Sequence, residues 1–208
     1  MIDWRDRLHN FWIDQGVVRL FWTNSAEVAP GVYRSNQPGQ KRLAAVKEKG
    51  VRSVLYLRGN TRSAPFRAEA AACKALGLDL HVFHMSAHRL PDASRIMALI
   101  DVFRQIEKPI LMHCRAGADR TGLASAIYLL ALENASIEDA RSMLSAQFGH
   151  WSWTSTGLLD QLLHHYDKDQ KETGSTFVEW VQTRYDPAFI TREFSQKSAV
   201  ERFKLSCR

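Results

Sequence analysis

The sequence predicts an α/β fold with a central, mostly parallel sheet flanked by helices and extra helices at the C-terminal end. Two observations lead to this prediction. Short, β-branched apolar stretches alternate with helical patterns in the middle of the chain, and the last quarter is helical in pattern throughout. Strands separated by helices pair in parallel, because each connection must cross back over the sheet.

Two helix–strand pairs open the pattern. A helix over 42–49 is followed by an apolar, β-branched strand over 51–58. An Ala-rich helix over 66–76 is then followed by a strand over 78–85. Each helix ends at a glycine, a common C-terminal cap.

A third pair and a long apolar helix come next. The helix over 92–108 has an apolar stripe, and Asp92 is placed to cap it. A short strand over 109–113 leads into a strongly apolar helix over 121–134. Further helices are predicted from Ser136 and over 158–166, 176–185 and 188–194.

Composition narrows the class of protein. The chain has 208 residues, 45% hydrophobic and 24% charged, which suffices for a folded core and excludes wholesale disorder. Its net charge of +6 favours anionic partners, namely nucleic acid, acidic lipid or phosphorylated molecules. Cys73, Cys114 and Cys207 lie too far apart for a disulfide framework or a Cys-x-x-Cys metal site. With no signal-peptide pattern and no 18-residue apolar run, we expect a soluble cytoplasmic protein.

The stretch 113–122, His-Cys-Arg-Ala-Gly-Ala-Asp-Arg-Thr-Gly, carries the candidate chemistry. It lies between a predicted strand and a predicted helix, where α/β sheets bind ligands. Its small residues let the backbone approach an anion, and the next helix adds its positive N-terminal end. We therefore expect a phosphate to bind at Arg115, Ala116, Gly117 and Ala118.

Three further residues of this stretch suggest a reaction. The N-terminus of a helix favours the nucleophilic thiolate form of a cysteine such as Cys114. The planar guanidinium of Arg120 can hold two phosphoryl oxygens at once. Thr121 is placed to donate a hydrogen bond to the sulfur and help it leave. An inert buried thiol beside a surface arginine is the opposing interpretation, and it leaves the ten-residue pattern unexplained.

Cys-x5-Arg followed by Thr-Gly and preceded by His resembles the signature loop of the protein tyrosine phosphatase superfamily. The stretch 32–38, Val-Tyr-Arg-Ser-Asn-Gln-Pro, is similar to the YRSxQP segment of small dual-specificity-type members. The resemblance covers about 28–149 and implies a dual-specificity phosphatase-like fold. It also implies a phosphocysteine mechanism without metal or cofactor, in which Cys114 attacks phosphorus and Arg120 binds the phosphoryl group.

The resemblance divides the chain into three parts of one domain. An amphipathic segment over 1–25 precedes a phosphatase core over 26–150 and a C-terminal helical extension over 151–208. The aromatic, basic N-terminal segment either docks on the core or lies on an anionic membrane. The C-terminal segment resembles the tail of bacterial phosphatases close to enzymes that act on phosphatidylglycerophosphate.

The general acid has two candidates. Many family members place an Asp about thirty residues before the cysteine, but here that span, residues 81–85, has no carboxylate. The next carboxylate along the chain is Asp92, which also suits a helix cap. Asp119 lies inside the loop, as in bacterial members whose loop reads Asp-Arg-Thr, and is narrowly preferred. Its alternative role is to orient Arg120 or the neighbouring backbone.

Other polar residues are candidates for binding roles. Arg58 ends a strand on the same sheet edge as Cys114, so it either meets a substrate anion or is simply solvated. His81, His84 and His88 suggest a metal, but strand alternation sends the first two to opposite faces and no ligand set is completed. We therefore predict that no metal binds.

The leading functional prediction is a cysteine-dependent, metal-independent phosphatase of the protein tyrosine and dual-specificity type, which hydrolyses phosphomonoesters through a phosphocysteine intermediate. The alternative is a phospholipid head-group phosphatase, acting on phosphatidylglycerophosphate or a phosphoinositide, peripheral on the inner face of a membrane. An inactive phosphate-binding module ranks lower because Cys114, Arg120 and Thr121 are intact. A sulfurtransferase ranks lower because its loops do not usually continue Arg-Thr-Gly, and nucleic-acid binding would rest on charge alone.

Overall fold

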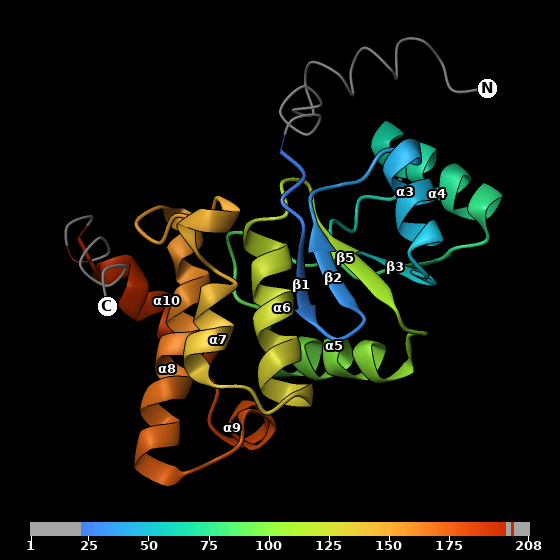
Figure 1. Cartoon of the computed structure of the whole chain (residues 1–208). Helices are drawn as coiled ribbons and strands as arrows, with labels where there is room; N and C mark the ends of the chain where they lie inside the picture. The colour runs from blue at the N-terminus through green and yellow to red at the C-terminus, as the bar shows by residue number, and fades with distance from the viewer. Residues whose placement is uncertain (1–21, 199–200, 202–208) are drawn as a thin grey trace. The chain divides into compact units, whose positions relative to one another are not determined.

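The computed structural model describes residues 22–198 and 201 of the chain (Figure 1). It separates into two compact units. The first comprises the described residues up to Met85 together with Ile106–Gly117 and holds the sheet. The second comprises Ser86–Gln105 and the described residues from Ala118 onward and is helical.

The sheet of the first unit has five strands in the order β1-β2-β5-β3-β4. Their bounds are β1 Ala26–Ala29, β2 Val32–Ser35, β3 Ser53–Tyr56, β4 Asp79–Val82 and β5 Ile110–His113. β1 pairs antiparallel with β2, and all other pairs are parallel. The predicted α/β class with a mostly parallel sheet is confirmed.

The register of the sheet determines which residues leave it side by side. His113 at the end of β5 pairs with Ser35 of β2 and with Tyr56 of β3. All residues of β3 and β5 are buried, as expected for central parallel strands. The residues that follow these three strands therefore emerge together at the carboxyl edge of the sheet.

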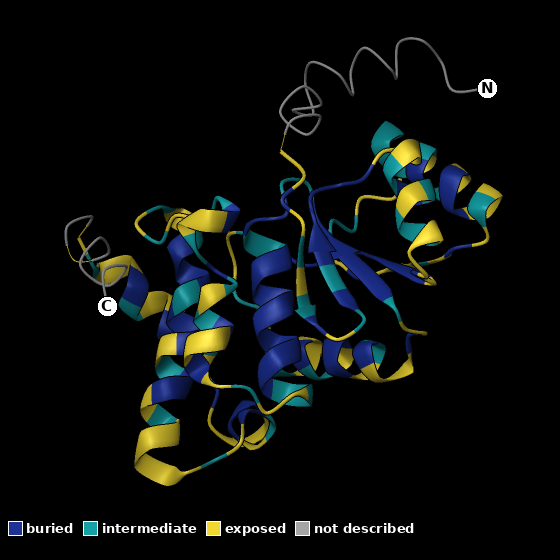
Figure 2. Ribbon diagram, in the orientation of Figure 1, coloured by how far each residue is buried: buried dark blue, intermediate teal, exposed yellow. Residues whose placement is uncertain are grey.

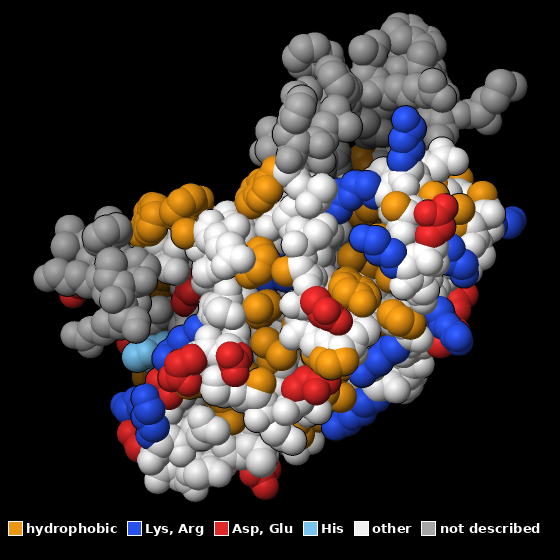
Figure 3. All heavy atoms as spheres, viewed as in Figure 1, with side chains coloured by type: hydrophobic (Ala, Val, Ile, Leu, Met, Phe, Trp, Pro, Cys, Tyr) orange, Lys and Arg blue, Asp and Glu red, His pale blue; other side chains and the backbone are white. Residues whose placement is uncertain are grey.

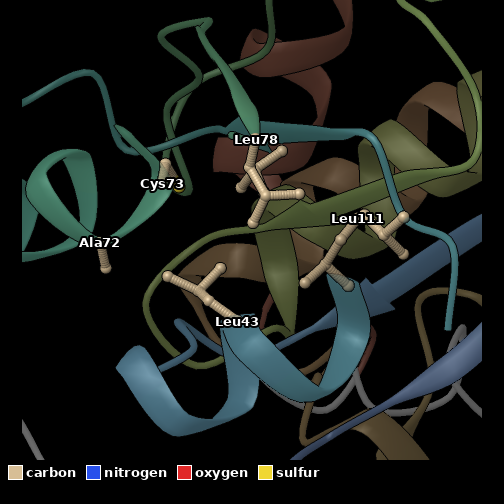
Figure 4. Packing of buried hydrophobic residues seen from close by; sticks show 7 residues of the cluster. Leu43, Ala72, Cys73, Leu78 and Leu111 are labelled. Carbon is tan, nitrogen blue, oxygen red and sulfur yellow. The ribbon is translucent and has the colours of Figure 1, made fainter. Parts of the chain in front are cut away.

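Helices α3 (Gln40–Glu48) and α4 (Ala64–Leu76) cover one face of this sheet (Figure 1). Figure 4 shows the cluster that joins them, in which Leu43 of α3 and Cys73 of α4 pack with Leu111 of β5. α4 ends at Gly77, as predicted, and this glycine adopts the left-handed conformation with φ +62°. Burial of apolar side chains against the sheet stabilises both helices.

The second unit is built around one central helix, which Figure 2 shows as almost wholly buried. Its helices are α5 Ala93–Gln105, α6 Asp119–Leu132, α7 Ile137–Ser142, α8 Leu158–Thr173, α9 Phe177–Thr183 and α10 Pro187–Gln196. The central helix, α6, contacts α5, α7 and α9, while α8 contacts α7, α9 and α10. The predicted helices at the C-terminal end are present, and Ser136 caps α7 by accepting a hydrogen bond from the Asp139 amide.

One element of the structure was not predicted, and one predicted segment lies mostly outside the described residues. The antiparallel hairpin β1–β2 was not predicted; it turns at Gly31, which adopts φ +74°. The amphipathic segment predicted over 1–25 lies almost entirely outside the described residues, so its docking and the three-part division stay predictions. Within residues 22–198 and 201, no helix is both long and apolar enough to cross a membrane.

Candidate active site

Cys114 follows β5 directly, at the carboxyl edge of the sheet. The Leu57 amide donates to the His113 carbonyl at 2.9 Å and so extends the β3–β5 pairing as far as the cysteine. Cys114 is 2% exposed. Its position after a central parallel strand is the one the sequence predicted.

The residues after Cys114 form a loop whose carbonyl groups are turned toward the protein. The carbonyls of Arg115, Ala116 and Gly117 each accept a hydrogen bond within the first unit. The donors are, in order, the Gln37 amide at 3.2 Å, the Asn24 side chain at 2.9 Å and the Arg34 guanidinium at 2.6 Å. Because N–H and C=O point in opposite directions in a trans peptide, the amides of residues 116 and 117 point away from these donors. Successive amides that face one side can bind an anion.

Gly117 is required for this loop. It adopts φ +76°, and a Cβ atom placed on it would lie 2.7 Å from backbone atoms of Ser35 and Asn36. Backbone atoms cannot move aside as a flexible side chain can, so only glycine lets the loop lie against the end of β2.

Arg34 is a site residue that the sequence reasoning missed. It is fully buried in β2 and donates to the Gly117 carbonyl. Burial lowers the pKa of Arg34 to about 10, against the opposing effect of the charge of Cys114, so the guanidinium remains positive at neutral pH. A buried positive charge therefore acts on Cys114. The available signal was its place in the stretch 32–38, which resembles the YRSxQP segment.

A buried chain of polar side chains supports the same sheet edge. His113 Nε2 lies 2.5 Å from Glu69 Oε1, and Gln37 Nε2 donates to Glu69 Oε2 at 2.8 Å. Arg58 donates to Gln37 Oε1, while His113 Nδ1 lies 3.1 Å from the Cys114 carbonyl. These hydrogen bonds hold the partly exposed Arg58 at the edge of the sheet where Cys114 also lies, as the sequence predicted. That Arg58 contacts the substrate stays a prediction.

Replacing Glu69 with alanine should lower the free energy of unfolding by about 3 kcal/mol, because His113 would lose its buried partner. Urea denaturation of the full chain measures this change. The matched control is Glu107→Ala, which removes the exposed partner of Arg52 and should cost less than about 1 kcal/mol. Equal losses in the two variants would contradict a stabilising role for the buried pair.

In the second unit, Asp119, Arg120 and Thr121 begin α6. Among the described residues, Arg120 Nε and Thr121 Oγ1 are buried without a hydrogen-bond partner. Gly122 packs closely here, since a Cβ atom on it would lie 2.6 Å from the Met143 carbonyl oxygen. Unpartnered donors at the N-terminus of a helix fit an anionic ligand.

The two acid candidates have different surroundings. Asp119 Oδ1 lies 2.8 Å from His150 Nδ1. Burial would raise the pKa of Asp119, but the hydrogen bond and charge of His150 and a hydrogen bond from Thr156 hold it below its ordinary value. Asp92 is exposed and caps α5 by accepting from the Arg95 amide at 2.8 Å, which lowers its pKa. The cap predicted for Asp92 is confirmed.

The other histidines and cysteines that the sequence singles out make different contacts. His84 Nδ1 lies 3.2 Å from the Arg58 carbonyl, and His88 Nδ1 lies 3.1 Å from Ser155 Oγ. In the part of the chain that the structure describes, no group of His, Cys, Asp and Glu side chains could hold a metal ion. Cys73 is buried in the core, and Cys207 lies outside the described residues.

Comparison with known proteins gives one matching family model and several relatives. The model for the DSP-PTPase phosphatase of polymorphic toxin systems matches residues 28–133, about half of the chain. Dual specificity protein phosphatase TpbA of Pseudomonas aeruginosa is 29% identical over 74% of this chain and 61% of its own length. Inositol diphosphatase DSP2 of Oryza sativa is 28% identical over 53% of this chain and 55% of its own length. The chain thus spans only about half to three fifths of these two proteins.

Solved structures show the same fold. The crystal structure of P. aeruginosa TpbA matches with a TM-score of 0.56 and 22% identity, covering 74% of this chain and 92% of that one. The core catalytic domain of the PP-IP phosphatase SIW14 from S. cerevisiae matches with a TM-score of 0.53 and 21% identity. That match covers 84% of this chain and 93% of the yeast domain.

Proposed function

Because the chain belongs to the DSP-PTPase phosphatase family of polymorphic toxin systems, we propose that it hydrolyses phosphomonoesters through a phosphocysteine intermediate. The observation that carries the proposal is the sequence after β5, in which Cys114 is followed by five residues, Arg120 and then Thr-Gly. The family model covers this whole stretch.

The reaction has two steps and uses no metal or cofactor. The Cys114 thiolate forms a bond to phosphorus as the bond to the leaving oxygen breaks, and a proton goes to that oxygen. Water then forms the new P–O bond, the S–P bond breaks, and inorganic phosphate leaves. Arg120 and the loop amides hold the phosphoryl oxygens, and Thr121 donates to the departing sulfur.

Features of the first unit support this assignment. Arg34 brings a buried positive charge to the thiol, and the inward-turned carbonyls of the loop leave amides to face an anion. Residues 40–75, which include α3 and α4, contain nine Lys and Arg against two Glu. Figure 3 shows blue side chains gathered over these two helices. A positive surface raises the rate at which anionic substrates are encountered.

We propose phosphorylated protein side chains as the substrates. TpbA, the bacterial relative, is named as a dual specificity protein phosphatase, and its structure has been solved in complex with pTyr. The phospholipid alternative depended on the N-terminal segment and on the likeness of the C-terminal tail, and no described contact favours it.

Hydrolysis of p-nitrophenyl phosphate by the purified full chain tests this function. Activity should persist in excess chelator, because the thiolate and Arg120 perform the chemistry. Loss of activity on chelation, restored by added divalent metal, would contradict the metal-free mechanism. A panel of phosphotyrosine peptide, phosphoinositide and phosphatidylglycerophosphate then tests the substrate class, with the peptide expected to have the highest kcat/KM.

A further inference from the structure

No sequence pattern marks His150, which is a buried histidine. It lies in the second unit, between the short 3₁₀ turn Ala146–Phe148 and α8, and is 1% exposed. Its Nδ1 lies 2.8 Å from Asp119 Oδ1, and its Nε2 lies 2.7 Å from Asp160 Oδ2 in the first turn of α8. Both ring nitrogens therefore face a carboxylate.

With a carboxylate at each ring nitrogen, His150 carries a proton on both nitrogens, one more than a neutral imidazole has. A neutral imidazole has one donor and one acceptor nitrogen, whereas two carboxylate neighbours require two donors. Burial alone would lower the pKa of His150, but its hydrogen bonds to Asp119 and Asp160 and their charges raise it to about 9. The negative charges of both aspartates act on the ring. The network stores a proton at neutral pH.

Asp119 connects this stored proton to the signature loop. It precedes Arg120 in the chain and also accepts a hydrogen bond from Thr156. A carboxylic acid of ordinary pKa, about 3.9, is almost fully ionised at neutral pH and has no proton to give. Linked to a protonated imidazole, the same carboxylate can deliver one. Asp92, by contrast, is occupied as the cap of α5.

We propose that Asp119, His150 and Asp160 form the proton relay of the phosphatase reaction. Asp119 is the residue that meets the leaving oxygen, and His150 and Asp160 are positioning residues that act through it. The inference rests on the phosphatase function proposed above. It identifies a source for the proton that the first step requires.

The proton that the relay gives up in the first step is returned to it in the second. As the P–O bond to the leaving group breaks, Asp119 gives a proton to the leaving oxygen and takes one from His150 Nδ1. His150 is then neutral, with its Nε2–H still donating to Asp160, and its Nδ1 lone pair faces an ionised Asp119. That repulsion makes the pair a strong base. In the second step the attacking water gives its proton to the pair as the S–P bond breaks, and the starting state returns.

The test compares two substrates of the full-length protein that differ in their need for an acid. p-Nitrophenyl phosphate releases a stable anion, whereas phenyl phosphate releases a phenolate that needs a proton. His150→Gln should lower kcat for phenyl phosphate by about a hundredfold and kcat for p-nitrophenyl phosphate by less than about threefold, with KM unchanged. The control His164→Gln changes an exposed histidine of α8 and should alter neither.

The pH profile gives a readout that a purely structural role would not change. In the unaltered protein, the ratio of phenyl to p-nitrophenyl phosphate turnover should fall as pH rises through about 9, where His150 loses its stored proton. Asp160→Asn removes a charge that raises the pKa of His150, so the fall should move to lower pH. A titrating group that changes the turnover of both substrates equally does not change this ratio.

Equal losses on both substrates in His150→Gln, or an unshifted profile in Asp160→Asn, would overturn the relay alone. Failure of the unaltered protein to hydrolyse either substrate would instead overturn the proposed phosphatase function. Should the His150 variant not fold, nitrogen NMR of the unaltered protein replaces it. Both ring nitrogens of His150 should carry protons at pH 7.5, and a neutral ring at that pH would overturn the relay.

Discussion

Cys114→Ser should lower kcat for p-nitrophenyl phosphate by at least about 10⁴-fold while phosphate still binds. A serine hydroxyl has the shape of the thiol but is far harder to ionise, so no phosphoryl–enzyme bond forms at neutral pH. The loop amides and Arg120 remain in place to hold the anion. Steady-state kinetics measures the loss of turnover, and calorimetry with inorganic phosphate measures the retained binding.

Cys73 provides the control within the same unit. It packs in the core between α4 and the sheet, and burial, with a smaller effect from Glu69, raises its pKa to about 12. A thiol of that kind is inert, so Cys73→Ala should leave kcat within about twofold of the unaltered protein. Turnover that survives in Cys114→Ser but disappears in Cys73→Ala would show that the nucleophile has been assigned wrongly.

Arg120→Lys should lower kcat by about 10³-fold, even though the positive charge is retained. The planar guanidinium holds two phosphoryl oxygens in a fixed geometry as charge develops in the transition state, whereas an ammonium group binds as a point charge. The control Arg184→Lys alters an exposed arginine that pairs with Asp169 and should leave kcat unchanged. A loss of less than about threefold in the Arg120 variant would mean that this side chain does not bind the transferring group.

The sheet could be predicted because its central strands have a strong local pattern. β3 and β5 are short apolar runs flanked by helices that end or begin at clear signals, such as Gly77 and Asp92. β1 and β2 have the same length, but each contains a charged residue and has mixed burial, so neither forms a continuous apolar run. Their hairpin is made by pairing along the sheet, which no local pattern encodes.

In the candidate site, too, the residues that are contiguous in sequence could be predicted, and those brought in by tertiary contacts could not. The loop after β5 is contiguous in sequence, so its nucleophile, its small residues and its arginine could be recognised together. Arg34, Glu69 and His150 lie far from it in sequence and acquire their roles through tertiary contacts. Arg34 stands in the stretch 32–38 that resembles a family segment, but no sequence pattern says which partner any of these three residues will meet.

Trapping the covalent intermediate tests the central claim most directly. The full chain would be mixed with a phosphomonoester, quenched by rapid denaturation during turnover, and digested for mass spectrometry. The mechanism predicts one phosphoryl group on the peptide that contains Cys114, present in the Cys73→Ala variant and absent in Cys114→Ser. Product formation without a phosphorylated enzyme, or with the phosphoryl group on another residue, would contradict it.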